Sequence, residues 1–151
     1  MAKKQKDVQY YEAVGRRKEA VARVRLHITA SKDGSVTVKD VLHKKGAITV
    51  NDMPIADYFT VLSQRNLILK PFEKTDTLDR FVVTVYVQGG GKDGQVTAVV
   101  LGISRALCLA DETFRSFLKP EGLLTRDPRV RERRKVGMGG KARRKRQSPK
   151  R

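Results

Sequence analysis

A glycine-rich segment offers the most specific chemistry in this 151-residue sequence. In GGGKDG, Gly89, Gly91 and Gly94 form the pattern G-x-G-x-x-G, directly after a β-type run and before a helical one. In dinucleotide-binding folds this pattern lets the backbone approach a pyrophosphate at the N-terminus of a helix. Those folds also need an acid at the end of a second parallel strand, about twenty residues further on. Asp111 and Glu112 have that spacing but follow a segment predicted to be helical throughout, so the sequence argues against a dinucleotide site.

A more general anion site fits the same segment. Glycine amides and a helix N-terminus can hold a phosphate of a nucleic-acid backbone, and Lys92 stands beside them. A Walker A loop is excluded because Gln95 and Val96, rather than Lys and Ser or Thr, follow Gly94. The alternative to a phosphate site is a tight, solvent-exposed turn between strand and helix, and the sequence favours neither.

Side chains suited to catalysis or metal binding are few. His27 and His43 are the only histidines, and neither has a cysteine, an acid or a nucleophile at the spacing of a metal or catalytic site. We predict that both lie on the surface. Cys108, the single cysteine, stands between two leucines in a helical pattern and is predicted to be a buried small apolar residue. We therefore predict a protein that is not an enzyme and that needs no cofactor and no metal.

Two groups of basic residues indicate a polyanionic partner. The segment GRRKEA places Arg16, Arg17 and Lys18 on a turn that leads into a strand, and Arg23 and Arg25 continue on one face of that strand. Only one acid interrupts this stripe, whereas an ordinary solvated face alternates its charges.

The second basic group is the C-terminal segment 126–151, with thirteen Lys and Arg, two acids and almost no apolar side chains. It cannot build a core, so we predict that it orders only along its partner. Each cation can neutralise a phosphate and release a counterion.

The whole composition agrees with a nucleic-acid partner. The sequence has 33 Lys and Arg against 16 Asp and Glu, a formal charge of +17, and a hydrophobic content of 39%. These values predict one domain with appendages that binds a polyanion. An anionic membrane is the competing polyanion, but no uninterrupted apolar run reaches the roughly eighteen residues of a membrane span. The N-terminus lacks the pattern of a signal peptide, so we expect a cytoplasmic protein without a membrane partner.

Hydrophobic patterns predict the elements that position these residues. Alternation predicts strands at 20–28 and 80–88. Between them, SKDGS is predicted to be a hairpin turn that leads into a strand in VTVKDV, and a further short strand is predicted in AITVN. Helical spacing predicts helices from Ile55, over 66–70 ending before Pro71, over 95–110, and over 114–118. A further short helix is predicted in VRERRKVG, after Asp127 as its cap. This order favours an α+β fold, with helices packed on one sheet.

Several motifs resemble, in order and spacing, the bacterial-type family of small-subunit ribosomal protein nine. They are GRRKEAVARVRL, ITVNDMPIADYF, VYVQGGGKDGQ, GISRAL, GLLTRDPRVRERRKVG and the terminal KARR and KR. The resemblance implies a two-layer α+β sandwich, with a four-stranded mixed sheet, helices on one face and a left-handed βαβ crossover. It also implies a fold shared with the second domain of small-subunit ribosomal protein five, and an extended basic tail. The domains expected are a flexible segment 1–9, a globular RNA-binding domain 10–125 and the basic tail 126–151.

The resemblance further implies a place in the head of the small ribosomal subunit, among its neighbouring proteins. The globular domain would bind small-subunit rRNA, and Lys150 and Arg151 at the tip of the tail would contact peptidyl-site tRNA. The residues predicted to bind rRNA are Arg16, Arg17, Lys18, Arg23, Arg25, Gly89, Gly90, Gly91, Lys92, Arg105, Arg126, Arg129, Arg131, Arg133, Arg134, Lys135, Lys141, Arg143 and Arg144.

The sequence departs from the family pattern at three places. Ser148 and Pro149 replace a large aromatic residue and Ser near the tip, Val100 replaces an arginine, and an additional hairpin lies near 29–46. Two other functions remain open on the sequence: an enzyme that uses GGGKDG on a nucleotide, and a free DNA-binding protein.

Overall fold

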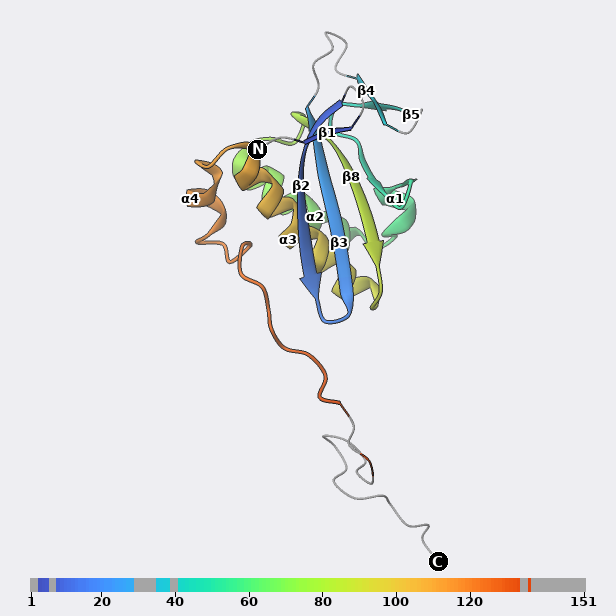
Figure 1. Ribbon diagram of the computed structural model, residues 1–151, viewed down its shortest axis with the longest axis vertical. Coiled ribbons are helices and arrows are strands. Elements are labelled where there is room, and N and C mark those ends of the chain that lie inside the picture. The colour runs from blue at the N-terminus through green and yellow to red at the C-terminus, as the bar shows by residue number, and fades with distance from the viewer. Residues whose placement is uncertain (1–2, 6–7, 29–34, 39–40, 134–135, 137–151) are drawn as a thin grey trace, which may run out of the picture.

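A mixed sheet of six strands forms one layer of the computed structural model, which describes residues 3–5, 8–28, 35–38, 41–133 and 136 (Figure 1). The strand order is β1-β2-β3-β8-β6-β7. Their bounds are Lys3–Gln5 (β1), Val8–Arg17 (β2), Ala20–Ile28 (β3), Ile48–Val50 (β6), Met53–Pro54 (β7) and Phe81–Gln88 (β8). Strands β6 and β8 are parallel, and the other neighbours are antiparallel.

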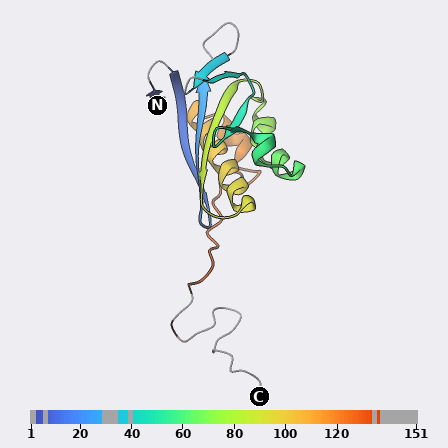
Figure 2. The same cartoon turned by 90° about the vertical axis from the view of Figure 1, so that its right-hand side faces the viewer.

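The predicted α+β fold, with a mixed sheet and helices on one face, is confirmed (Figure 2). The predicted number of four strands is wrong, because two short edge strands, β1 and β7, extend the sheet. Strand β1 pairs with the start of β2, within the segment predicted to be flexible. The flexibility of 1–9, the limits of the domains, the relation to small-subunit ribosomal protein five and the hand of the crossover stay predictions.

Strands β2 and β3 form a hairpin that dominates the sheet. Its register pairs Tyr10 with His27 and Arg17 with Ala20, which leaves a turn of only two residues. Lys18 in this turn has a φ of 50°, in the left-handed region that favours glycine. Alternation along β3 buries Ala20, Ala22, Val24 and Leu26 toward the helices, as predicted, and leaves the arginines on the open face.

The long helix α3, Lys92–Ala110, packs across the helix-side face of β2 and β3. The helix is long enough, and with a mean hydropathy of 1.3 apolar enough, to cross a membrane. However, 56% of its apolar stretch is buried inside the protein, as in a core helix. Gly15 and Gly102 allow a very close approach: a Cβ on Gly15 would overlap the carbonyl oxygen of Ala98 and lie 2.6 Å from the nitrogen of Gly102. The backbones of sheet and helix therefore touch at this point.

Three shorter helices complete the second layer: α1 (Ile55–Tyr58), α2 (Leu62–Thr75) and α4 (Phe114–Leu118). The chain passes through β7, α1 and α2 between the parallel strands β6 and β8. The prediction that α2 ends before Pro71 is wrong, because Pro71 lies inside the helix. Ile68, Pro71 and Phe72 are buried there, and their burial offsets the roughly 3 kcal/mol that an internal proline costs.

The predicted additional hairpin near 29–46 is confirmed as β4 (Ser35–Val38) paired with β5 (Val41–Lys44), a separate two-stranded sheet. The prediction that SKDGS is its turn is wrong, because β3 pairs with β2 and β8, and VTVKDV spans the two strands of the hairpin. It lies at one end of the main sheet, beside β8 and β6 (Figure 1). After α4 the chain runs along the side of the body that lies away from the β4–β5 hairpin, and it leaves the body near the β2–β3 turn (Figure 1). The predicted helix in VRERRKVG is wrong for the described residues of that segment, which are not helical.

Candidate nucleic-acid interface

Arg16 and Arg17 are neighbours in sequence but lie on opposite faces of β2. Arg16 is exposed on the open face, opposite Val21. Arg17 turns toward the helix side, where its Nη2 lies 2.9 Å from Oδ2 of Asp127 and its Nη1 donates to the carbonyl oxygen of Arg129 at 2.7 Å. The basic stripe predicted on one face is thus divided: Arg17 holds the start of the C-terminal segment, while Arg16 and Lys18 stay exposed.

Asp127 is the junction between the body and the C-terminal segment. Its carboxylate accepts hydrogen bonds from the backbone and side chain of Arg129 and pairs with Arg17. These bonds, those from Arg129 foremost, hold the pKa of Asp127 well below its usual range and raise that of Arg129. Asp127 therefore fastens an extended turn rather than capping a helix.

The cations of the C-terminal segment that the structure describes are exposed: Arg126, Arg129, Arg131 and Arg133. Arg134, Lys135, Lys141, Arg143, Arg144, Lys150 and Arg151 lie outside the described residues. The ion pair of Arg17 with Asp127 places the start of this segment beside the β2–β3 turn (Figure 1).

The glycine-rich segment lies against the same turn. A Cβ on Gly89 would approach the carbonyl oxygen of Glu19 to 2.5 Å, and one on Gly90 would meet Ala20 at 3.1 Å. Both glycines also have positive φ, 73° and 63°. Tight packing against the hairpin thus accounts for these two glycines, as the turn alternative predicted.

Gly91 is the N-cap of α3, and no side chain caps this end of the helix. The backbone amides in the first turn of α3 can therefore donate hydrogen bonds to a phosphate. Lys92, however, is turned to the body: its Nζ donates to the carbonyl oxygen of Tyr58 at 3.1 Å and lies 3.3 Å from the centre of that ring. An anion here would rely mainly on backbone groups, and Asp93 in the same turn opposes it.

The open face of the sheet carries Arg23 and Arg25 next to aromatic rings. Arg23 is exposed, with its guanidinium 5.5 Å from the ring centre of Tyr86. Arg25 is half-buried, lies 4.9 Å from the ring centre of Tyr10 and pairs with Glu12 at 2.8 Å. Arg23 is thus the more available of the two for a phosphate or a base.

Arg105 on α3 spans to the sheet, where its Nη1 donates to the carbonyl oxygen of Val14 at 2.9 Å. This bond satisfies a backbone group of β2 beyond the short stretch that pairs with β1. Part of the role of Arg105 is therefore structural.

The histidines do not follow the prediction of surface positions. His27 is only 1% exposed and its Nε2 lies 2.9 Å from Oγ1 of Thr84, while His43 is partly buried. Burial, followed by the charge of Arg25, lowers the pKa of His27 to about 4. His27 lies on the open face of β3, where Tyr10, with its ring centre 5.7 Å away, and Thr84 contact it from other strands, so the local pattern did not reveal its burial.

Cys108 is partly buried and packs against the core, and burial raises the pKa of its thiol. No cluster of potential metal ligands occurs among the residues that the structure describes. Asp111 closes the C-terminal end of α3, about 28 Å along the 19-residue helix from Gly91, too far to bind a ribose at the glycine segment.

Two features of the site were not anticipated from sequence. Tyr58 fixes Lys92, and Tyr86 presents a half-exposed ring between Arg23 and the strand β6. The role of Tyr86 could have been predicted from sequence, because it is an aromatic residue at an exposed position of the alternating strand FVVTVYVQ.

Comparisons with known proteins agree on one family. The profile described as "Ribosomal protein S9/S16" matches residues 15–151. Two curated relatives, both called "Small ribosomal subunit protein uS9", come from Dehalococcoides mccartyi strains BAV1 and CBDB1. Each is 42% identical over 129 residues, which cover 85% of this chain and 86% of the relative.

Proposed function

The chain belongs to the ribosomal protein S9 family, and we propose that its globular part binds small-subunit rRNA and that its C-terminal tail reaches peptidyl-site tRNA. The family is a structural component of the small ribosomal subunit in the bacterial cytoplasm. Membership of this family makes the chain a non-enzymatic protein of translation, which removes the nucleotide enzyme and the free DNA-binding protein as alternatives.

One observation carries the rRNA-binding proposal: two groups of cations and the N-terminus of a helix meet at one end of the body. Arg16 and Lys18 are exposed on the β2–β3 hairpin, the N-terminus of α3 lies against that hairpin, and the C-terminal segment is fastened to it through Arg17. A polyanion that lies along this end touches all three features at once. Neighbouring proteins of the subunit head are further partners of the same proposal.

The tRNA contact rests on the reach and the charge of the tail. From the fixed point at Asp127, twenty-four further residues extend to Arg151, enough for a span of roughly 80 Å when fully extended. The segment has too few apolar side chains to fold back on the body, so its length is available for a distant phosphate backbone. Lys150 and Arg151 are the residues that we assign to the tRNA.

The test separates the two RNA partners. A chain that ends at Gly140 is expected to enter small subunits in a sucrose gradient, whereas subunits that carry it bind peptidyl-site tRNA more weakly or hold the reading frame less well. Unchanged tRNA affinity and fidelity would contradict the tRNA contact.

For rRNA binding, the variant Arg16→Gln/Lys18→Gln is expected to lower the salt dependence of binding, by about 0.7 to 0.9 in the logarithmic slope for each lost phosphate contact. The matched control is Arg115→Gln/Lys119→Gln, which removes two exposed cations from the region of α4. Equal slopes for the two double variants would contradict the assignment of the hairpin.

A further inference from the structure

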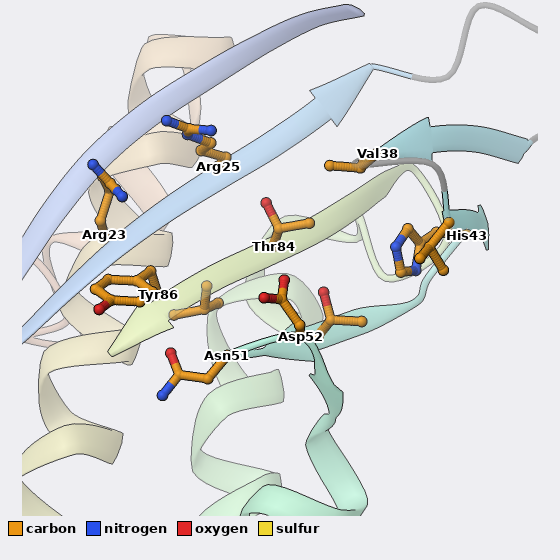
Figure 3. Close-up of a pocket in the computed structure, with 11 residues that line it drawn as sticks. Arg23, Arg25, Val38, His43, Asn51, Asp52, Thr84 and Tyr86 are labelled. Carbon is orange, nitrogen blue, oxygen red and sulfur yellow. The ribbon is translucent and has the colours of Figure 1, made fainter. Parts of the chain in front are cut away.

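A pocket of about 290 Å³ lies between the open face of the main sheet and the β4–β5 hairpin (Figure 3). Residues from both sheets line it: Arg23, Arg25, Val38, Val41, His43, Thr49, Asn51, Asp52, Thr84, Val85 and Tyr86. None of the three features that carry the rRNA proposal belongs to it, although Arg23 and Arg25 are also predicted to bind rRNA. At this volume the pocket suits one small ligand unit rather than a longer segment of chain.

One end of the pocket combines an aromatic ring with two guanidinium groups. Tyr86 is 52% exposed, and on the neighbouring strand β3 Arg23 and Arg25 project from the same face. Figure 3 shows both arginines and Tyr86 on one side of the pocket. The guanidinium of Arg23 already lies over the ring at 5.5 Å, which leaves the side of Tyr86 toward β6 for a planar ligand.

The β6 side of the pocket, which lies next to Tyr86 and continues to the β4–β5 hairpin, offers hydrogen-bonding groups at fixed positions. Asn51 uses its side-chain amide on the backbone of Val87, at 3.1 Å and 2.8 Å, and so prolongs the pairing of β6 with β8. Asn51 and Asp52 both have positive φ, 49° and 65°, which costs free energy for residues other than glycine. This strained backbone puts the Asp52 carboxylate beside Thr84 and His43 at the rim (Figure 3).

The roof of the pocket comes from the additional hairpin, through Val38, Val41 and His43. Val41 is largely exposed although it faces a hollow lined by polar groups. The pocket thus has an apolar part at the hairpin and a half-exposed tyrosine at its other end, with the polar side chains of Thr84 and Asp52 between them (Figure 3).

We propose that this pocket binds one unstacked base of single-stranded rRNA, with the adjoining phosphate on Arg23 and Arg25. The inference deepens the proposed function and rests on the chain being an rRNA-binding protein. A base supplies a planar face that can stack on Tyr86 and edge groups that Thr49, Thr84 and Asp52 can hydrogen-bond. An acidic peptide of a neighbouring protein fits less well, because it would bring carboxylates next to Asp52 and would leave the ring unused.

The two experiments use small subunits assembled with the full-length chain. In the first, subunits are irradiated with ultraviolet light, and peptides that contain Tyr86 or Arg23 are examined by mass spectrometry for a covalently attached nucleotide. In the second, rRNA in subunits carrying Tyr86→Leu or Arg23→Gln is treated with a reagent that modifies unpaired bases. The matched controls are Phe117→Leu and Arg115→Gln, since Phe117 is 58% exposed and both residues lie on α4.

The expected result is a nucleotide attached to the Tyr86 peptide and one unpaired rRNA base whose modification rises in both pocket variants but in neither control. Loss of one base stack corresponds to a rise of roughly 5- to 150-fold in the exposed fraction of that base, until modification is complete. A pocket peptide attached only to another protein, or a modification pattern equal to that of the controls, would overturn the proposal. Normal entry of the variants into subunits in that case would leave the proposed function intact.

Discussion

The contact between β2 and α3 at Gly15 makes a quantitative prediction about stability. In Gly15→Ala, the new Cβ would overlap the carbonyl oxygen of Ala98 and lie 2.6 Å from the nitrogen of Gly102. Real Cβ contacts keep to at least about 3.0 Å, and both opposing atoms are backbone, so no side chain can rotate away. The helix must shift, and overpacking of this kind costs about 3 kcal/mol, the upper part of its usual range. For a chain of this length that corresponds to a fall in Tm of roughly 6–12 °C.

Thermal and urea unfolding of the isolated full-length protein measure this effect. The matched control is Gly91→Ala, at a position with a φ of −101° and no atom within 4 Å of the added Cβ. Because Gly91 is only an N-cap, its replacement should cost at most about 1 kcal/mol. If Gly15→Ala and Gly91→Ala lower Tm equally, the close approach of strand and helix is not a constraint on this fold.

Two other predictions concern charge. Because the pKa of His27 falls from 6.5 in the unfolded chain to about 4 in the fold, the unfolded state binds more protons between these values. The free energy of unfolding should therefore drop by up to about 3 kcal/mol as pH falls from 6.5 to 4, and urea titrations of His27→Gln should show a flatter profile; equal profiles would refute the assignment. Arg17→Gln should accelerate amide hydrogen exchange over 126–131 because it removes the ion pair with Asp127, whereas Arg16→Gln on the opposite face should not; identical exchange in both variants would contradict the anchor.

The sequence predicted those elements whose pattern is strong and local. The alternation in β3 and β8 and the helical spacing in α3 correspond to faces that are buried. Strand β2 was not predicted, because its turn to β3 consists of Lys18 and Glu19 and lacks the Gly or Asn that usually marks a hairpin. Lys18 adopts φ 50° there only because the long ladder between β2 and β3 holds it, and such a tertiary cause leaves no trace in the turn itself.

Errors at Pro71 and His27 have a common physical origin. Local rules end a helix at proline and place histidine at the surface, but contacts with segments distant in sequence bury Pro71 in the helix layer and His27 on the open face of the sheet. The basic residues illustrate the same limit. Composition identifies them as cations, yet only the packed structure distinguishes Lys92, which is bound to Tyr58, from Lys18, which is exposed.

Arg16 and Arg17 have different roles, and this difference connects the fold to the proposed function. Successive residues of a strand project to opposite faces, so one pair of arginines supplies both an exposed cation and an internal anchor for the C-terminal segment. Without the anchor, a segment with a net charge of +11 would be repelled by the hairpin, which is also basic. Asp127 offsets that repulsion at the point of closest approach, so the tail begins at the basic end of the body. A single RNA strand can then pass from the hairpin to the tail without crossing a gap in positive charge.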